Sequence, residues 1–503
     1  MSPAIVITII AAYFGVLLLV AHFTSKGADN DSFFTGNKKS PWYLVAFGMI
    51  GASLSGVTFL SIPGWVGNPD NQFSYMQVVF GYLLGYIVVA YVLMPIYYRM
   101  NLTSIYTYLE QRFGYYSHKT GAIFFLGSRL LGSAIRLLLV ANVLQIFLFD
   151  QLHVSFEMTV FLSIVLIWIY TQKGGIKTII WTDTLQTFFM IAAVLLMCYI
   201  IVGDLNLHNK GVIASITDSQ YSRIFFFDDW AAKNYFWKHF LGGIFIAIGM
   251  TGLDQDMMQK NLSCKNIKEA QKNMMSFAVV LVFVNLIFLG LGALLYMYSI
   301  ETGIGQGAAG DDLFATIALN PKTGIFVGIL FLVGLIAAAY SSADSALTAL
   351  TTSFSFDIFD FGKKGKEEQN KLRKRVHIGV SILLLVTIII LKYTTSSSAI
   401  GLVMFFAGFT YGPLIALFFF GILTKRILND KLVPLACIVA IGVTILLWYF
   451  SAGAPGVGAG NSGILGKYAI GFELIIINSV ITFLTLLAIS KKGSVKSFIN
   501  FTL

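Results

Sequence analysis

Thirteen stretches of mainly apolar residues, each roughly 20 residues long, follow one another through this 503-residue chain and limit how it can fold. A helix needs about 20 apolar residues to cross the hydrocarbon core of a bilayer. The strands of a membrane barrel would be about ten residues long with alternating polarity, and these stretches show neither property. They lie at residues 4–23, 42–62, 75–98, 122–149, 156–172, 180–203, 236–253, 275–298, 325–353, 375–393, 399–424, 432–451 and 468–489. The sequence therefore predicts an all-α polytopic membrane protein with about 13 transmembrane helices.

The positive charge of the chain follows a membrane topology. Of the residues, 57% are hydrophobic and only 12% are charged, with a formal net charge of +10. If the N-terminus lies outside, the inside loops hold 25 of the 34 Lys and Arg residues, including the dense run at 363–375. Inside loops of membrane proteins carry this excess. We therefore expect a multi-pass membrane protein with the N-terminus outside and the C-terminus inside, the bilayer as a partner and no nucleic acid.

Two of the apolar stretches contain residues that interrupt helices. GASLSGVTFLSIPG at 51–64 combines three glycines, three serines, a threonine and a proline, and a Gly-Pro pair lies at 412–413. A helix that breaks at membrane depth frees backbone carbonyls and amides, which is tolerated where they line a cavity or bind ions. A kink with local repair of the helix is the alternative. We favour a binding site at 51–64.

A polar face runs along the apolar stretch at 325–353. Its members fall at helical spacing on one side and are Ser341, Asp344, Ser345, Thr348 and Thr352, with Ser342 at the margin. Oxygen ligands suit small hard cations such as sodium. A polar stripe that packs against a neighbouring helix is the alternative. Because a carboxylate within the membrane is costly, Asp344 favours a functional role.

Two further aspartates lie near the inner ends of apolar stretches. Asp183, in GGIKTIIWTDTLQTFFM, either faces cytoplasmic water or points inward toward Asp344. Asp254, in GMTGLDQDMMQKNLS, has either a water-facing or gating role or is only an interfacial charge.

Two arginines lie within the stretch at 122–149. Arg129 and Arg136 are seven residues apart and share a helix face. A guanidinium binds a carboxylate with two parallel hydrogen bonds, which suits an anionic ligand. Arg129 could instead extend to the inner membrane surface. Arg136 lies deeper, where it needs a negative partner, either an aspartate or a bound anion.

Four segments together resemble a known family. They are FFTGNKKSPW (33–42), GGIKTIIWTDTLQ (174–186), LDQDMMQKNLS (253–263) and AAAYSSADSALTALTTSFSFDIF (337–359). In this order they resemble the sodium/solute symporter family, which includes sodium–glucose cotransporters and bacterial sialic acid transporters. The resemblance covers essentially the whole chain and implies a leucine-transporter-type fold of two inverted five-helix repeats. It implies one transporter domain made of an extra helix at 4–23, repeat one at 42–203, repeat two at 236–424 and two extra helices at 432–489.

The resemblance also implies where sodium binds. The main site would consist of backbone carbonyls and serine hydroxyls, namely the carbonyls of Gly51, Leu54 and Ala338 and the hydroxyls of Ser341 and Ser342. A second site, found in some members, would use Asp183, Ser341, Asp344 and Ser345. Many members have a serine or small residue where this chain has Asp344, so the two carboxylates either strengthen sodium binding or share a proton. We expect one sodium ion and leave a second open.

Substrate contacts implied by the resemblance come from the broken helix and the next span. They are Ser53, Ser55, Thr58 and Gln77, to which we add Arg129 and Arg136. We expect sodium-coupled import, by alternating access, of a small polar organic solute that is anionic, such as a sialic acid or another carboxylate.

Other functions remain as alternatives. A neutral sugar or polyol is the alternative solute, although the stretch at 275–298 lacks a charged residue of the kind expected in a glucose-type site. A sensor or a channel is an alternative of another class. An aspartyl protease using Asp183 and Asp344 would need a Gly-x-Gly-Asp motif where this chain has Ser-Ala-Asp, so we expect no enzyme. No oligomeric state follows from the sequence.

Overall fold

Helices dominate the part of the chain that the structure describes. The computed structural model describes residues 3–26, 29–207, 211–308, 310–394, 399–452, 454 and 463–493. Within these ranges, nine helices are long and apolar enough to cross a membrane, or up to eleven if two bent helix pairs each form one span. Two shorter apolar helices, at 156–172 and 474–488, coincide with the two remaining predicted stretches. The prediction of an all-α membrane protein is confirmed.

The first half of the chain forms the helices that surround the first break. In order these are α1 (Pro3–Thr24), α2 (Asn30–Thr35), α3 (Trp42–Ser53), α4 (Gly56–Trp65), α5 (Tyr75–Val88), α6 (Met94–Arg99), α7 (Thr107–Arg112), α8 (Tyr115–Leu144), α9 (Phe156–Asp204) and α10 (Val212–Thr217). The 49-residue helix α9 contains two spans, because Gly175 has a non-helical backbone (φ 52°, ψ −139°).

The second half continues with helices and one small strand pair. In order these are α11 (Phe236–Ala247), α12 (Gln255–Leu262), α13 (Ile267–Thr302), α14 (Leu313–Ala318), α15 (Ile325–Ser353), α16 (Lys366–Thr394), α17 (Ala399–Leu423), β1 (Ile427–Leu428), α18 (Val433–Tyr449), α19 (Leu474–Ala488) and β2 (Ser490–Lys491). β1 and β2 pair antiparallel.

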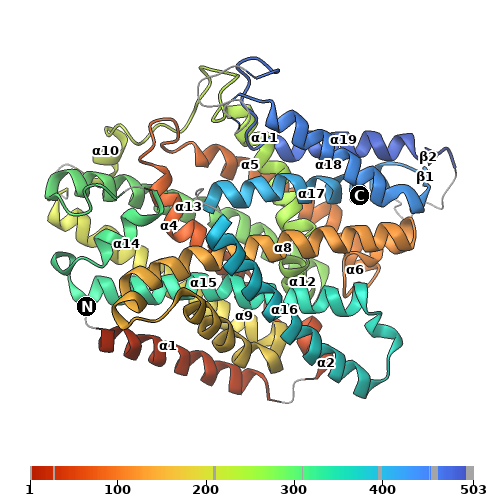
Figure 1. Ribbon diagram of the computed structural model, residues 1–503, viewed down its shortest axis with the longest axis horizontal. Coiled ribbons are helices and arrows are strands. Elements are labelled where there is room, and N and C mark those ends of the chain that lie inside the picture. The colour runs from red at the N-terminus through yellow and green to blue at the C-terminus, as the bar shows by residue number, and fades with distance from the viewer. Residues whose placement is uncertain are drawn as a thin grey trace.

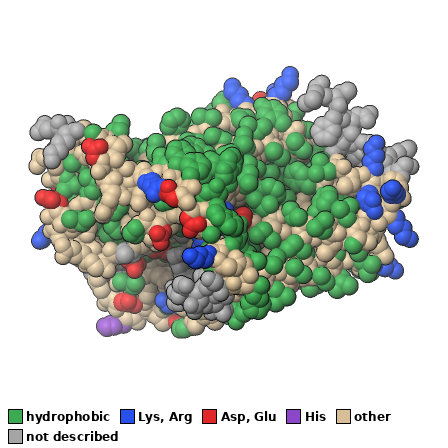
Figure 2. Space-filling model, turned by 90° about the horizontal axis from the view of Figure 1, so that it is seen from above, with side chains coloured by type: hydrophobic (Ala, Val, Ile, Leu, Met, Phe, Trp, Pro, Cys, Tyr) green, Lys and Arg blue, Asp and Glu red, His purple; other side chains and the backbone are tan. Residues whose placement is uncertain are grey.

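The long helices run side by side along the longest axis of the molecule. In Figure 1, α1, α8, α15 and α17 cross the view in this direction, with α10 and α14 at the left end and α2 and the strand pair at the right. Figure 2 shows apolar side chains covering the middle of one face, while Lys and Arg gather at the right end. The basic residues therefore gather at one end of the long helices, as in a bundle that crosses a membrane.

Two helices break inside this bundle. α3 and α4 are bent by 58° around Leu54 and Ser55, which confirms the predicted interruption at 51–64. α11 and α12 are bent by 63° around Leu253 and Asp254, after a π-helical turn at 248–252. The sequence predicts only the end of a span at this second place, so this break is a correction.

The predicted interruption at the Gly-Pro pair 412–413 is wrong. α17 continues through Pro413. Proline has no N–H and so leaves the carbonyl four residues earlier without its helical partner. The Asn478 side chain on α19 replaces that partner, because its Nδ2 donates to the carbonyls of Gly408 and Phe409, both at 3.0 Å. Gly412 allows this approach, since a Cβ there would lie 2.6 Å from the Asn478 amide.

The helix α15 lies at the centre of the bundle. Every residue from Phe331 to Ser353 is buried, and the helix packs against α9, α8 and both halves of the first broken helix. By contrast, only 28% of the apolar window of α1 is buried within the protein. The polar face of α15 is therefore enclosed by protein and not exposed to lipid.

Glycines let α5 and α11 approach closely. A Cβ on Gly81 would lie 2.1 Å from the backbone oxygen of Phe240, and one on Gly243 would lie 2.2 Å from that of Val78. Small residues at helix contacts are how membrane helices pack their backbones together. This contact supports the wall of the cavity described below.

We predict that Gly81→Ala destabilises the protein, because the added methyl group meets backbone atoms that cannot rotate away. The expected cost is roughly 1–3 kcal/mol, as for other overpacked sites. The matched control is Gly127→Ala in α8, where a Cβ would meet nothing within 4 Å. Thermal unfolding of the purified variants measures both effects. Equal melting temperatures for the two variants would contradict the predicted contact.

Candidate functional site

A central cavity lies at the break between α3 and α4. Residues of α5, α8, α11, the π-helical turn at 248–252, α12, α13 and α17 complete its wall. The polar lining comprises Ser53, Ser55, Thr58, Tyr75, Tyr82, Tyr86, Arg129, Arg136, Thr251 and Asn285. Alanine, methionine, valine, leucine and isoleucine side chains cover the rest. The cavity thus offers hydroxyls, an amide and positive charge within an otherwise apolar wall.

The structure brings five of the six predicted substrate residues to this cavity, and Gln77 is the exception. Its Nε2 donates to the Asn234 carbonyl (3.0 Å) and lies 3.2 Å from His239 Nδ1, while its Oε1 accepts from the Phe226 amide (3.2 Å). With both ends of the amide engaged, Gln77 joins α5 to the chain before α11. Gln77 therefore does not line the cavity in this structure.

Three tyrosines of α5 line the cavity and were missed from the sequence. Tyr75, Tyr82 and Tyr86 lie seven and four residues apart, which places them on one helix face. The hydroxyls of Tyr75 and Tyr82 are 3.1 Å apart. Their spacing was visible in the sequence, but tyrosines in an apolar span are common, and nothing marked these as lining residues.

The two arginines of α8 have different surroundings. Arg129 is buried and pairs through Nη2 with Asp256 Oδ2, and its Nη1 lies 3.7 Å from Asp254 Oδ2. The possibility that Arg129 extends to the membrane surface is therefore wrong. Arg136 is only partly buried, and its Nε has no hydrogen-bond partner. No carboxylate of the described residues forms an ion pair with Arg136.

Asp254 occupies the second helix break and does not face water. It is fully buried and begins α12, where its Oδ1 accepts from the Asp256 amide at 2.9 Å. Its Oδ2 accepts from the Tyr411 hydroxyl at 2.6 Å. An interfacial or water-facing position is thus excluded, because α12 continues the bundle inward beyond the break.

The backbone carbonyls at the two breaks differ in whether they accept a hydrogen bond. At the second break, the Tyr97 hydroxyl donates to the Gly252 carbonyl (2.9 Å) and the Tyr106 hydroxyl to the Leu253 carbonyl (2.8 Å). At the first break, no N–H or hydroxyl of the described residues donates to the carbonyls of Gly51 and Leu54. The final carbonyls of a helix need partners from outside it. The first break therefore retains acceptors that a cation can use.

The serine hydroxyls predicted for the main sodium site lie on the neighbouring helix α15. Ser342 is 1% exposed, and its Oγ has no hydrogen-bond partner in the described part of the chain. Ser341 donates to Asp183 Oδ1 at 2.8 Å. Ala338 is buried one turn earlier. The helix that carries them, α15, packs against both α3 and α4.

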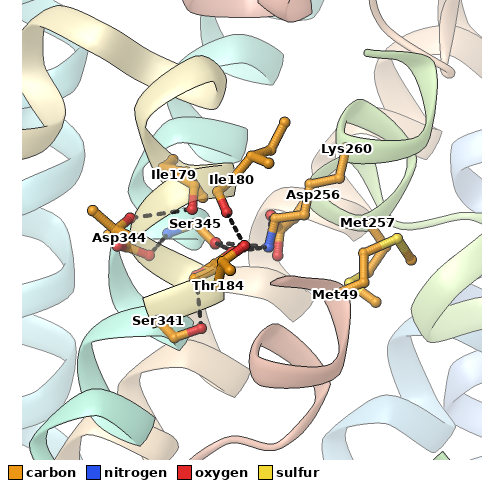
Figure 3. Close-up of polar contacts among 12 residues, drawn as sticks. Met49, Ile179, Ile180, Thr184, Asp256, Met257, Lys260, Ser341, Asp344 and Ser345 are labelled. Carbon is orange, nitrogen blue, oxygen red and sulfur yellow. Dashed lines mark hydrogen bonds and ion pairs between the residues drawn. The ribbon is translucent and has the colours of Figure 1, made fainter. Parts of the chain in front are cut away.

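The cluster predicted as a second cation site contains an unpredicted lysine. Lys260 Nζ lies 2.8 Å from Asp183 Oδ2, 2.8 Å from Ser345 Oγ and 3.5 Å from Asp256 Oδ1. Figure 3 shows Lys260 and Asp256 extending from α12 toward Ser345, with Asp344 on the far side of Ser345. The possibility that Asp183 faces cytoplasmic water is wrong, because the side chain is fully buried.

Asp344 takes part in this cluster from its edge. Its Oδ2 accepts from the Tyr170 hydroxyl at 2.8 Å, and it forms no ion pair with Lys260 within 4.0 Å. The sequence signal for the lysine was the spacing of Asp256 and Lys260, which lie four residues apart and so share a helix face. What the sequence did not show is that this face of α12 turns toward α9 and α15.

We predict that Asp256→Asn strongly destabilises the protein, since Asp256 lies between Arg129 and Lys260. Removing one partner of a buried ion pair typically costs about 3–5 kcal/mol, because the other charge stays buried without compensation. The matched control is Asp228→Asn, whose pair with Arg223 is exposed and contributes little. Melting temperatures of the two variants measure the difference. A loss no larger for Asp256→Asn than for Asp228→Asn would contradict the inferred network.

The chain is similar to bacterial sialic acid symporters. It is 26% identical over 457 residues to the sodium/sialic acid symporter NanT of Aliivibrio fischeri, covering 88% of this chain and 86% of that one. It is also 26% identical to the sodium/sialic acid symporter SiaT of Proteus mirabilis, covering 83% and 84%. Both alignments extend over most of each protein.

The fold is similar to that of a solved Na⁺-coupled sialic acid symporter in its substrate-bound, outward-open state. The TM-score is 0.81 at 22% identity, over 97% of this chain and 99% of that chain. This likeness confirms the predicted leucine-transporter-type fold. The profile of the sodium:solute symporter family matches residues 33–431. This integral multi-pass membrane protein therefore belongs to the sodium:solute symporter family.

Proposed function

We propose that this protein imports a small organic anion together with sodium, and that sialic acids are the first anions to test. The observation that carries the proposal is the unpaired guanidinium of Arg136 in the cavity wall. The two symporters that match over most of their length are both named for a sugar acid.

The difference between the two arginines supports an anionic solute. Arg129 already pairs with Asp254 and Asp256, so its charge is compensated within the protein. Arg136 lines the same cavity without such a partner. Withdrawing a charge from water is costly unless a counter-charge meets it. A carboxylate of the solute would supply that charge and bind with two parallel hydrogen bonds.

The remaining lining suits a polyhydroxylated body. Ser53, Ser55, Thr58 and Asn285 can hydrogen-bond hydroxyl or amide groups of a solute, and the rings of the α5 tyrosines provide flat apolar surface. A neutral sugar could use this part of the wall but would leave Arg136 uncompensated. The carboxylate therefore distinguishes the proposed solute from a neutral sugar or polyol.

Sodium would bind where α15 meets the first helix break. The ligands we propose are the carbonyls of Gly51, Leu54 and Ala338 and the hydroxyls of Ser341 and Ser342. Their support is the set of unpaired acceptors at Gly51, Leu54 and Ser342. An ion there would hold the broken helix against α15. Its entry releases about 2.3 kcal/mol per charge for each 100 mV of membrane potential.

Transport would proceed by movement of the broken helices against the rest of the bundle. We propose that repeat one spans 42–203 and repeat two spans 236–424, with 4–23 and 432–489 as added helices. The concentration of Lys and Arg at one end supports an inside position for that end. We propose the inner membrane of a bacterium as the location, with the N-terminus outside.

The solute class is tested by ligand binding to purified protein, with sodium and with choline in its place. We expect binding of small organic acids that requires sodium, with sialic acids first in the panel and neutral sugars and polyols as comparison. Binding of neutral sugars alone would overturn the anionic proposal. Solute binding of equal strength in choline would contradict the coupling to sodium.

Arg136→Ala should weaken binding of the anion by roughly 2–5 kcal/mol, the range for truncating one partner of a buried charge pair. The control Arg375→Ala removes an exposed arginine of α16 and should leave affinity unchanged. Isothermal titration of both variants with the same anion measures the loss. Unchanged affinity in Arg136→Ala would remove this residue from the solute site.

Ser342→Ala removes one proposed sodium ligand without affecting the carbonyls, so we expect the half-saturating sodium concentration for solute binding to rise severalfold. The control is Ser381→Ala in α16, whose hydroxyl bonds only its own helix at the His377 carbonyl (2.8 Å). Sodium titrations at fixed solute measure the shift. If both variants keep the sodium dependence of the parent, Ser342 is not a ligand.

A further inference from the structure

The ammonium group of Lys260 lies among oxygens that would suit a metal cation. Its neighbours are Asp183 Oδ2 and Ser345 Oγ, both at 2.8 Å, and Asp256 Oδ1 at 3.5 Å. Lys260 is 1% exposed and Asp183 is fully buried. The three partners come from three helices, α9, α15 and α12. The lysine therefore meets carboxylate and hydroxyl oxygens in an enclosed space, as a bound sodium ion would.

We propose that Lys260 is a tethered cation that fills the second cation position, so that the protein binds one sodium ion in each transport cycle. This inference rests on the proposed coupling to sodium and defines its stoichiometry. The position is defined by Asp183, Ser345 and Asp256, with Asp344 at its edge.

The hydrogen-bonding capacity of the ammonium matches this position. A lysine carries three N–H donors and no acceptor, and three acceptor groups surround Lys260. The ammonium itself has no lone pair with which to coordinate a metal ion beside it. A sodium ion at the same place would also meet the repulsion of a like charge in a region screened from water. Because the lysine is covalently part of the chain, it does not dissociate from this position, and free sodium competes poorly with it.

Negative charge exceeds the fixed positive charge of the cluster. Asp183, Asp254 and Asp256 contact the positive charges of Arg129 and Lys260, and Asp344 is a fourth carboxylate at the edge. Asp183 also accepts a hydrogen bond from Ser341, a proposed ligand of the main site, so this excess of negative charge lies next to the expected sodium ion.

The place of Lys260 in the fold lets it act as a bound cation acts. It lies on α12, the second half of a broken helix, whereas Asp183 and Ser345 lie on α9 and α15. Movement of broken helices against the rest of a bundle is the usual basis of alternating access. Lys260 thus joins the moving and the stationary parts without being released to either side of the membrane.

Direct counting of bound sodium tests the proposal in the full-length protein. Equilibrium binding of ²²Na⁺ to purified protein, with choline replacing sodium in the blank, should saturate at one ion per chain. The sodium dependence of the melting temperature should fit a single site. Two bound ions in the unmodified protein would overturn the proposal.

Three variants separate the role of the charge from that of the fold. Lys260→Met keeps a long side chain but removes the charge, and it should bind two sodium ions, because Asp183, Asp256 and Ser345 are then free to hold the second. Lys260→Arg keeps a tethered positive charge and should bind one. Lys260→Met combined with Asp183→Asn removes the lysine together with its carboxylate partner and should return to one.

Each outcome decides between the alternatives. A folded Lys260→Met protein that still binds a single ion would contradict the proposal. If Lys260→Met alone does not fold, the decision rests on the unmodified protein, Lys260→Arg and the double variant. One bound ion in each of these three supports the proposal. Two bound ions in any of them overturns it. A complete lack of saturable sodium binding, with Ser342→Ala behaving like its parent, would instead contradict the proposed coupling to sodium itself.

Discussion

Backbone groups inside a bilayer need hydrogen-bond partners, and this requirement organises the centre of the protein. Two helices stop within the bundle, and each stop frees carbonyls. At the second break, two tyrosine hydroxyls donate to freed carbonyls, and the Asp254 carboxylate accepts from the backbone amide of Asp256. At the first break, the carbonyls of Gly51 and Leu54 face no donor among the described residues. The same constraint is therefore met by protein hydrogen bonds at the second break, whereas the first break retains free carbonyls that can bind an ion.

The charged side chains also fall into two groups, those that are paired within the protein and one that is not. Arg129, Asp256, Lys260 and Asp183 form a continuous row of ion pairs from α8 through α12 to α9. Such a row satisfies its members internally and links the second broken helix to its neighbours. Arg136, two turns from Arg129 on the same helix, has no such partner. We infer that the row positions α12 and holds Lys260 at the second cation position, whereas Arg136 is available to a solute.

Sequence reasoning succeeded where a local property determines the structure. Apolar length predicted the spans, and the glycines, serines and proline at 51–64 predicted the first break. It failed where a distant residue decides the outcome. Pro413 does not break α17, because Asn478 of α19 supplies the missing hydrogen bonds. In the sequence, Lys260 is one of several lysines after an apolar stretch. In the structure, the bend after Gly252 directs α12 toward Asp183 and so brings Lys260 to this carboxylate. Gln77 and the α5 tyrosines share one helix, and only packing shows which side faces the cavity.

The most direct measurement is uptake of a radiolabelled sialic acid by proteoliposomes that contain the purified protein. With an inward sodium gradient and a negative interior, the account predicts accumulation above the external concentration. It also predicts collapse of that accumulation when choline replaces sodium or when an ionophore removes the gradient. Accumulation that is equal with and without a sodium gradient would contradict the central claim. So would uptake confined to neutral sugars when a panel of small organic acids is tested under the same gradient.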